Sequence, residues 1–135
     1  MDRFALVNWV SVFVAALAGF VVGSLWYGPL FGRTWQRVTG LTKEAGSRIS
    51  MPVTFGGAYL LNLIAAAGIA LQNGAHTGWL FGLHVGLMGA AFFIAPALGV
   101  IYLFEQRPFK QWLVNAGYQL VNFSAMGAII GAWPR

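Results

Sequence analysis

Four long apolar segments follow one another along this chain of 135 residues, separated by short polar stretches. They predict membrane-spanning helices over about 4–27, 53–71, 79–104 and 112–133. At 1.5 Å per residue the first would be about 36 Å long, enough to cross about 30 Å of hydrocarbon with some tilt. The sequence therefore predicts an all-α polytopic membrane protein, with one four-helix domain over residues 1–135.

Aromatic residues and prolines mark where two of these helices should end or bend. Trp26 and Tyr27 have apolar rings with one polar atom, which suits them to the membrane–water interface. Gly28-Pro29 follows directly and predicts that the first helix stops there, because proline cannot donate the next helical hydrogen bond. Pro96 predicts a kink in the third helix for the same reason.

Basic residues are distributed unevenly between the two sides of the predicted membrane domain. Six of the eight Lys and Arg residues lie in the loop 28–52 and the connector 105–110, and the other two lie near the termini. The positive-inside rule then places both loops in the cytoplasm and both termini outside, as in a multi-pass protein of the bacterial inner membrane. Trp35 within the long loop indicates a short helix lying on the lipid headgroups.

Composition narrows the possible partners. Apolar residues make up 59% of the chain and charged residues 8%, whereas soluble domains have about 25% charged residues. The net charge of +5 is not gathered into a dense patch beside exposed aromatic residues, so nucleic acid is not expected as a partner. Membrane lipids, in particular anionic headgroups, are the expected partner for this charge.

Small residues recur at helical spacing in the last two predicted helices. Such strips allow helices to approach closely in a membrane. We predict helix-packing roles for six glycines: Gly78, Gly82, Gly86, Gly117, Gly127 and Gly131. Two separate strips offer more close-packing surface than one bundle needs, so we expect a homo-oligomer, with a twofold dimer favoured.

Large polar side chains are unusually frequent inside the predicted spans. The candidates for a shared polar cavity are Asn62, His84, Asn115, Tyr118, Gln119 and Asn122. Polar residues in a membrane either line a functional cavity or bond to one another across helices. The sequence leaves both interpretations open.

We expect no catalytic residue, cofactor or metal site in this chain. The acidic residues Asp2, Glu44 and Glu105 lie at or beyond the membrane boundaries, so no carboxylate pair is expected within the membrane. The serines there have only His84 as a base, with no carboxylate to orient it. His76 and His84 are too few for a metal or haem, unless a symmetric partner supplies a second His84. There are no cysteines.

The motifs at the helix ends are similar to those of a known family. They are Leu25-Trp26-Tyr27-Gly28-Pro29-Leu30-Phe31-Gly32, Tyr102-Leu103-Phe104-Glu105-Gln106-Arg107-Pro108-Phe109-Lys110, Asn8-Trp9 and Asn115-Ala116-Gly117-Tyr118-Gln119-Leu120-Val121. With these, the chain resembles the domain of unknown function 1761 family of bacterial membrane proteins. The resemblance implies a four-helix integral membrane protein and implies no activity.

Two functions fit these observations. The first is a small oligomeric carrier or channel that binds a polar or amphipathic solute through the amides of the second, third and fourth helices. The alternative is a non-catalytic accessory subunit or lipid-interacting scaffold of a membrane complex. An interior hollow lined by the amides would favour the first, and a solid interior the second.

Overall fold

The structure is a computed structural model that describes residues 3–39, 51–75 and 78–133. Within these ranges every regular element is helical, which confirms the predicted all-α class. The elements are η1 (Arg3–Leu6), α1 (Trp9–Leu25), η2 (Trp26–Leu30), α2 (Gly32–Thr39), α4 (Met51–Asn73), α5 (Trp79–Gly89), η3 (Ala90–Ile94), α6 (Ala95–Phe104) and α7 (Phe109–Ala132).

Four of the helical runs in these ranges are long and apolar enough to cross a membrane. They cover Trp9–Leu30, Pro52–Asn73, Trp79–Phe104 and Phe109–Ala132. The prediction of four helices of membrane-spanning length and composition is confirmed. The first begins later than expected, because the Asn8 side chain caps α1 by accepting a hydrogen bond from the Ser11 amide at 3.1 Å.

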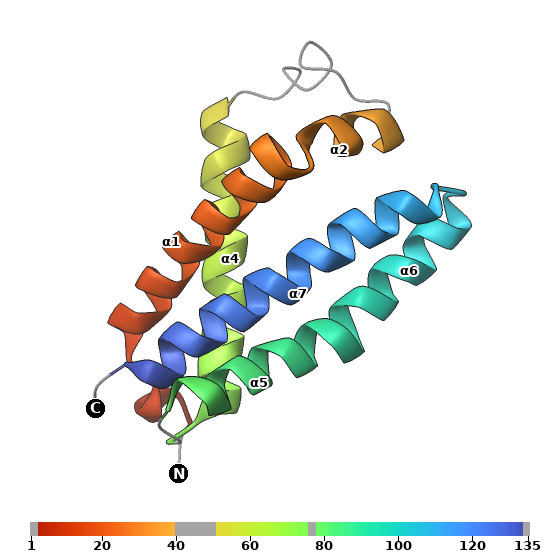
Figure 1. Cartoon of the computed structure of the whole chain (residues 1–135). Coiled ribbons are helices and arrows are strands. Elements are labelled where there is room, and N and C mark those ends of the chain that lie inside the picture. The colour runs from red at the N-terminus through yellow and green to blue at the C-terminus, as the bar shows by residue number, and fades with distance from the viewer. Residues whose placement is uncertain (1–2, 40–50, 76–77, 134–135) are drawn as a thin grey trace.

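Helix α7 is the centre of the bundle. It packs against α1, α4, α5 and α6, as Figure 1 shows, and α5 and α1 make its most extensive contacts. The N- and C-terminal ends lie together at one end of the bundle (Figure 1). Helix α2, the start of α4 and the connector between α6 and α7 lie at the opposite end (Figure 1). We call it the basic end because Arg33 and Arg37 lie on α2, Arg107 on the connector and Lys110 in the first turn of α7.

The first helix does not stop at Gly28-Pro29: that prediction is wrong, and the helical run ends at Leu30, three residues beyond the predicted end at residue 27. The chain continues as the π-helical turn η2, in which the Phe31 amide donates to the Trp26 carbonyl at 2.7 Å. This wider turn accommodates the missing N–H of Pro29 without ending the helix. The backbone leaves helical geometry at Phe31, and α2 begins at Gly32.

A second π-helical turn, η3, lies directly before Pro96. In it the Ala95 amide donates to the Ala90 carbonyl, five residues back. Elements α5, η3 and α6 therefore follow one another without a loop. The Ala95 carbonyl accepts a hydrogen bond from the Trp112 indole of α7 at 2.8 Å, which fastens this irregular stretch to the central helix.

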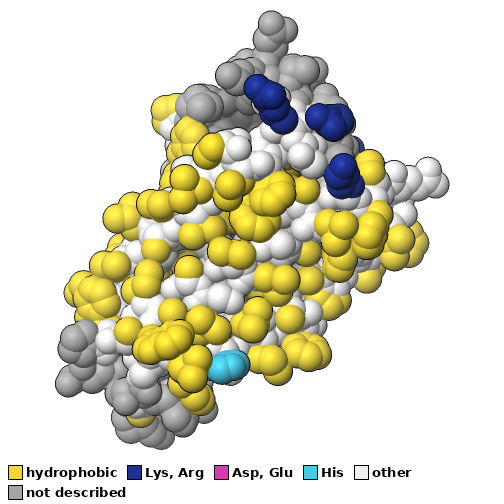
Figure 2. Space-filling view, in the orientation of Figure 1, with side chains coloured by type: hydrophobic (Ala, Val, Ile, Leu, Met, Phe, Trp, Pro, Cys, Tyr) yellow, Lys and Arg dark blue, Asp and Glu magenta, His cyan; other side chains and the backbone are white. Residues whose placement is uncertain are grey.

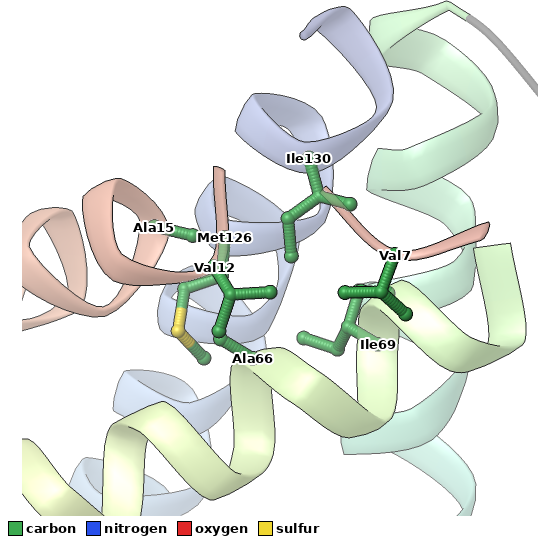
Figure 3. Close-up of a cluster of buried hydrophobic side chains, with 8 residues drawn as sticks. Val7, Val12, Ala15, Ala66, Ile69, Met126 and Ile130 are labelled. Carbon is green, nitrogen blue, oxygen red and sulfur yellow. The ribbon is translucent and has the colours of Figure 1, made fainter. Parts of the chain in front are cut away.

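The buried core fills the end of the bundle near the termini. Its members come from the chain start, α1, α4 and α7: Val7, Val12, Ala15, Ala66, Ile69, Ala70, Met126 and Ile130. Figure 3 shows the side chains of Val12, Ile69, Met126 and Ile130 directed toward one another. This half of the bundle is therefore packed with apolar side chains.

The two glycine strips pack against each other within one chain. A Cβ added at Gly82 would overlap the Gly127 carbonyl, one at Gly127 would overlap the Gly82 carbonyl, and one at Gly131 would overlap the Gly78 carbonyl. The Gly78 amide also donates to the Gly131 carbonyl at 2.8 Å. The inference that the strips are surplus to one bundle is thus wrong, because each is the partner of the other. Gly117 packs instead against Trp26.

Much of the remaining surface is apolar. On the face drawn in Figure 2, hydrophobic side chains cover the body of the molecule, and the Lys and Arg side chains that the structure describes lie at one end. Side chains such as Phe93, Leu103 and Phe104 are at least 74% exposed, which suits contact with lipid. The homo-oligomer stays a prediction, and its interface would have to lie on such a surface.

Candidate binding cleft

A cleft of about 510 Å³ lies between α1 and α4, with α7 as its floor. It occupies the part of the bundle toward the basic end, beyond the apolar core. Its lining residues are Gly19, Phe20, Gly23, Ser24, Tyr27, Gly28, Thr54, Phe55, Ala58, Asn62 and Tyr118. No charged side chain is among these described lining residues.

Glycines on α1 shape the floor of the cleft. A Cβ at Gly19 would lie 2.5 Å from Asn122 Oδ1, and one at Gly23 would lie 3.4 Å from the Tyr118 hydroxyl. Polar side chains of α7 can therefore reach the backbone of α1. Gly19, Gly23 and Tyr27 are spaced by four residues and so share one face of the helix.

Aromatic residues of α1 and α4 form the wall of the cleft. The Phe20 ring lies 5.9 Å from both the Phe55 and the Tyr59 ring, measured between centroids. The Tyr59 hydroxyl donates to the Phe13 carbonyl at 3.0 Å, which ties α4 to α1 beside the cleft. The two helices are joined there, and the cleft opens beyond that joint.

The polar floor is an amide pair with a tyrosine beside it. Asn122 Nδ2 donates to Asn62 Oδ1 at 3.3 Å, and Tyr118 lines the cleft together with Asn62. Asn122 is 1% exposed and its Oδ1 has no hydrogen-bond partner. An unpaired buried acceptor is uncommon in a membrane span, where no bulk water can satisfy it.

A second polar cluster adjoins the first. The Tyr27 hydroxyl donates to Asn115 Oδ1 at 2.6 Å, and Asn115 Nδ2 donates to the Tyr102 hydroxyl at 2.9 Å. The Tyr27 ring also contacts Tyr118, with centroids 5.2 Å apart, and Trp35 of α2, with centroids 5.9 Å apart. Tyr27 therefore links the cleft to α6, α7 and α2.

A family model described as protein of unknown function (DUF1761) matches residues 10–131, nearly the whole chain. The chain belongs to the DUF1761 family. This confirms the resemblance drawn from the helix-end motifs. Neither the curated proteins nor the solved structures contain a match to this chain.

The predicted polar residues of this DUF1761 chain do not form one group. Asn62 and Tyr118 line the cleft, Asn122 lies at its floor, and Asn115 belongs to the adjoining cluster. Gln119 has a buried Oε1 atom without a hydrogen-bond partner. His84 lies apart: it is exposed on α5, and its Nδ1 is 2.9 Å from the carbonyl of Leu80, one turn earlier.

Several cleft residues were not predicted from the sequence. Ser24, Thr54 and Phe55 line it, and Tyr27 had been interpreted only as an interfacial residue. The four-residue spacing of Gly19, Gly23 and Tyr27 was the available signal for a polar face on α1. Among the described residues no group of three His, Cys, Asp or Glu is placed to hold a metal.

Proposed function

We propose that this protein is a membrane-embedded, non-enzymatic carrier that binds an amphipathic solute in the cleft between α1 and α4. The observation that supports it is the cleft itself: an open space within the spans, with aromatic walls and a polar floor. Ligand sites commonly combine mostly apolar walls with a few placed polar groups.

The chemistry of the lining indicates what the solute carries. The walls offer Phe20, Phe55 and Ala58 to an apolar tail, and the floor offers the hydrogen-bonding groups of Asn62 and Tyr118. Because the lining has no charged side chain, a charged head would be left without a counter-ion at that depth. The solute that fits therefore has an uncharged head bearing hydroxyl or amide groups.

The distribution of polar and apolar side chains favours a carrier over a channel. A channel needs a polar path through both halves of the membrane. Here the apolar core fills the half near the termini between α1, α4 and α7, including Met126 and Ile130, which are at most 1% exposed. A hollow of about 750 Å³ between α4 and α5 has Gln72 as the one polar side chain among its described lining residues, so it offers no polar path either. The cleft is thus open from one half of the bundle only.

The second candidate, an accessory or scaffold subunit, is supported by a different observation. The amides are partly used in bonds with other side chains of the bundle, Asn62 with Asn122 and Asn115 with the Tyr27 hydroxyl, which is the pattern of interlocked packing. A homodimer in the bacterial inner membrane is compatible with either proposal. Its contact would have to use exposed apolar positions such as Phe92 or Phe93, which are at least 63% exposed.

Photo-crosslinking separates the two candidates. The protein is reconstituted in phosphatidylcholine nanodiscs with a monoacylglycerol that has a diazirine in its tail, irradiated and mapped by mass spectrometry. We expect labelling to concentrate on the cleft-lining segments 19–28 and 54–62. Ala58→Phe should fill the cleft and remove most of this labelling, whereas Ala97→Phe, on the exposed face of α6, should leave it unchanged.

The scaffold candidate predicts a different result. Labelling would then be spread over all lipid-exposed helix faces, and Ala58→Phe and Ala97→Phe would have equal effects. That outcome would overturn the carrier proposal, because no site in the bundle would prefer the probe.

A further inference from the structure

A smaller recess of about 270 Å³ lies at the basic end, where α6 ends and α7 begins. It is separate from the cleft and shares no lining residue with it. Its lining residues are Gly99, Tyr102, Leu103, Arg107, Pro108, Phe109 and Trp112. It combines one guanidinium group with aromatic and aliphatic walls.

The backbone of the connector holds the recess in shape. Gln106 has φ +58°, a left-handed conformation that side-chain-bearing residues adopt infrequently. The turn is closed by hydrogen bonds from the Gln106 amide to the Leu103 carbonyl at 3.2 Å and from the Arg107 amide to the Tyr102 carbonyl at 2.9 Å. The backbone of Arg107 is therefore held in place beside the recess.

Two stacked rings form the wall contributed by α7. The Phe109 and Trp112 centroids are 5.6 Å apart with an interplanar angle of 26°. The Trp112 indole is oriented by its hydrogen bond to the Ala95 carbonyl, and a Cβ added at Gly99 would lie only 3.2 Å from its Nε1 atom. The indole N–H is thus already used, and Arg107 supplies the charge of the recess.

The electrostatics of this end favour an anion. Arg107 Nε lies 3.3 Å from Glu105 Oε1, and both side chains are about half exposed. Nearby helices α2 and α7 add Arg33, Arg37 and Lys110, which are exposed. Glu105 is the one acidic side chain that the structure describes, so its carboxylate competes with any incoming anion for Arg107.

An apolar surface adjoins the charged recess. Leu103 is 79% exposed and Phe109 is 70% exposed, although both line the recess. In a bilayer these side chains contact acyl chains. A ligand that fills the recess while satisfying both surfaces needs a negatively charged group and a hydrocarbon chain.

We propose that this recess binds the phosphate group of an anionic phospholipid, with Arg107 contacting the phosphate and the acyl chains lying along Leu103 and Phe109. Basic pockets between membrane helices at the cytoplasmic side are recognised sites for anionic lipid headgroups. The recess would bind an anionic ligand and the cleft an uncharged one, because the recess has a guanidinium group and the cleft lining has no charged side chain.

Native mass spectrometry of the full-length protein tests the proposal. Protein is released from nanodiscs containing equal amounts of phosphatidylglycerol and phosphatidylcholine, and retained lipids are counted. We expect the wild type to retain phosphatidylglycerol preferentially. Arg107→Gln should lower that retention about fivefold, the effect of one basic residue near a membrane surface. Arg37→Gln, which removes the same charge outside the recess, should lower it much less.

A second variant distinguishes lipid binding from a structural role of the ion pair. Glu105→Gln removes the competing carboxylate and should raise phosphatidylglycerol retention, whereas a purely structural pair predicts unchanged or lower retention. Equal losses for Arg107→Gln and Arg37→Gln, or no gain for Glu105→Gln, would overturn the proposal. Displacement of the lipid by millimolar inorganic phosphate would also overturn it, because that would indicate a site for a soluble anion.

Discussion

The close contact between α5 and α7 predicts that a Gly→Ala substitution inside it lowers the free energy of unfolding, whereas the same substitution at an open glycine does not. A methyl group at Gly82 would occupy the position of the Gly127 carbonyl oxygen. The obstacle is backbone, so no side-chain rotation can relieve the overlap and the two helices must move apart. The separation would also stretch the 2.8 Å bond from the Gly78 amide to the Gly131 carbonyl.

The expected magnitude follows from two opposing terms. Forcing extra volume into a well-packed contact costs about 1–3 kcal/mol, and a backbone obstacle places Gly82→Ala at the upper end of that range. Replacing a helical glycine by alanine returns about 0.5–1 kcal/mol, because the unfolded chain loses conformational freedom. We therefore expect Gly82→Ala to lower the free energy of unfolding by about 2 kcal/mol.

Two glycines on α4 are matched controls. Gly57 and Gly68 lie inside another of the four long apolar helices, and an added Cβ at either would meet no atom within 4 Å. Gly68→Ala should therefore leave stability unchanged or raise it by up to about 1 kcal/mol. Unfolding is followed by far-ultraviolet circular dichroism during titration of dodecylmaltoside micelles with sodium dodecyl sulfate.

The comparison is decisive because the same chemical change is made at each position. If Gly82→Ala were as stable as Gly68→Ala, α5 and α7 would not approach as the structure has them. The conclusion that the glycine strips pair within one chain would then fail.

Two further predictions follow from the polar residues and from the charge distribution. Asn122→Leu leaves Asn62 Oδ1 without its donor and should lower the free energy of unfolding by about 1 kcal/mol in the same titration. Gln119→Leu removes an Oε1 atom that has no hydrogen-bond partner and should not lower the free energy of unfolding. A larger loss for Gln119→Leu than for Asn122→Leu would contradict the assigned bonds. In this cysteine-free chain, Lys110→Cys should react with an impermeant thiol reagent only from the cytoplasmic side and Ala75→Cys only from outside. Labelling of Lys110→Cys in intact cells would contradict this prediction and indicate the opposite orientation in the membrane.

The membrane spans could be predicted because their signal is local. The predicted third helix, 79–104, coincides with the observed span Trp79–Phe104, since a run of apolar residues is sufficient to define it. The wrong prediction of a helix end at Pro29 also comes from a local signal. A proline forbids one hydrogen bond but does not dictate whether the helix ends or widens, and here it widens into η2 and continues to Leu30.

The candidate site was less predictable because it depends on which helix faces meet. A strip such as Gly127 and Gly131 shows that a close neighbour exists, yet the strip opposite it could belong to the same chain or to another. The sequence marks Asn62 and Asn122 as polar residues inside apolar helices, but their pairing arises only where α4 meets α7. His84 has the same apparent polarity and lies on an exposed face, satisfied within its own helix.

The cleft and the recess at Arg107 lie in the same half of this molecule, and that asymmetry bears on both proposals. The cleft reaches from mid-span to Tyr27 and Thr54 beside the basic end, and the recess at Arg107 lies at the same end. The apolar core occupies the end near the termini. Under both proposals, the bound lipid or amphipathic solute would exchange with one leaflet without crossing the packed half. Passage to the other leaflet would require that core to open, so binding at the basic end is the step that the observed architecture permits by itself.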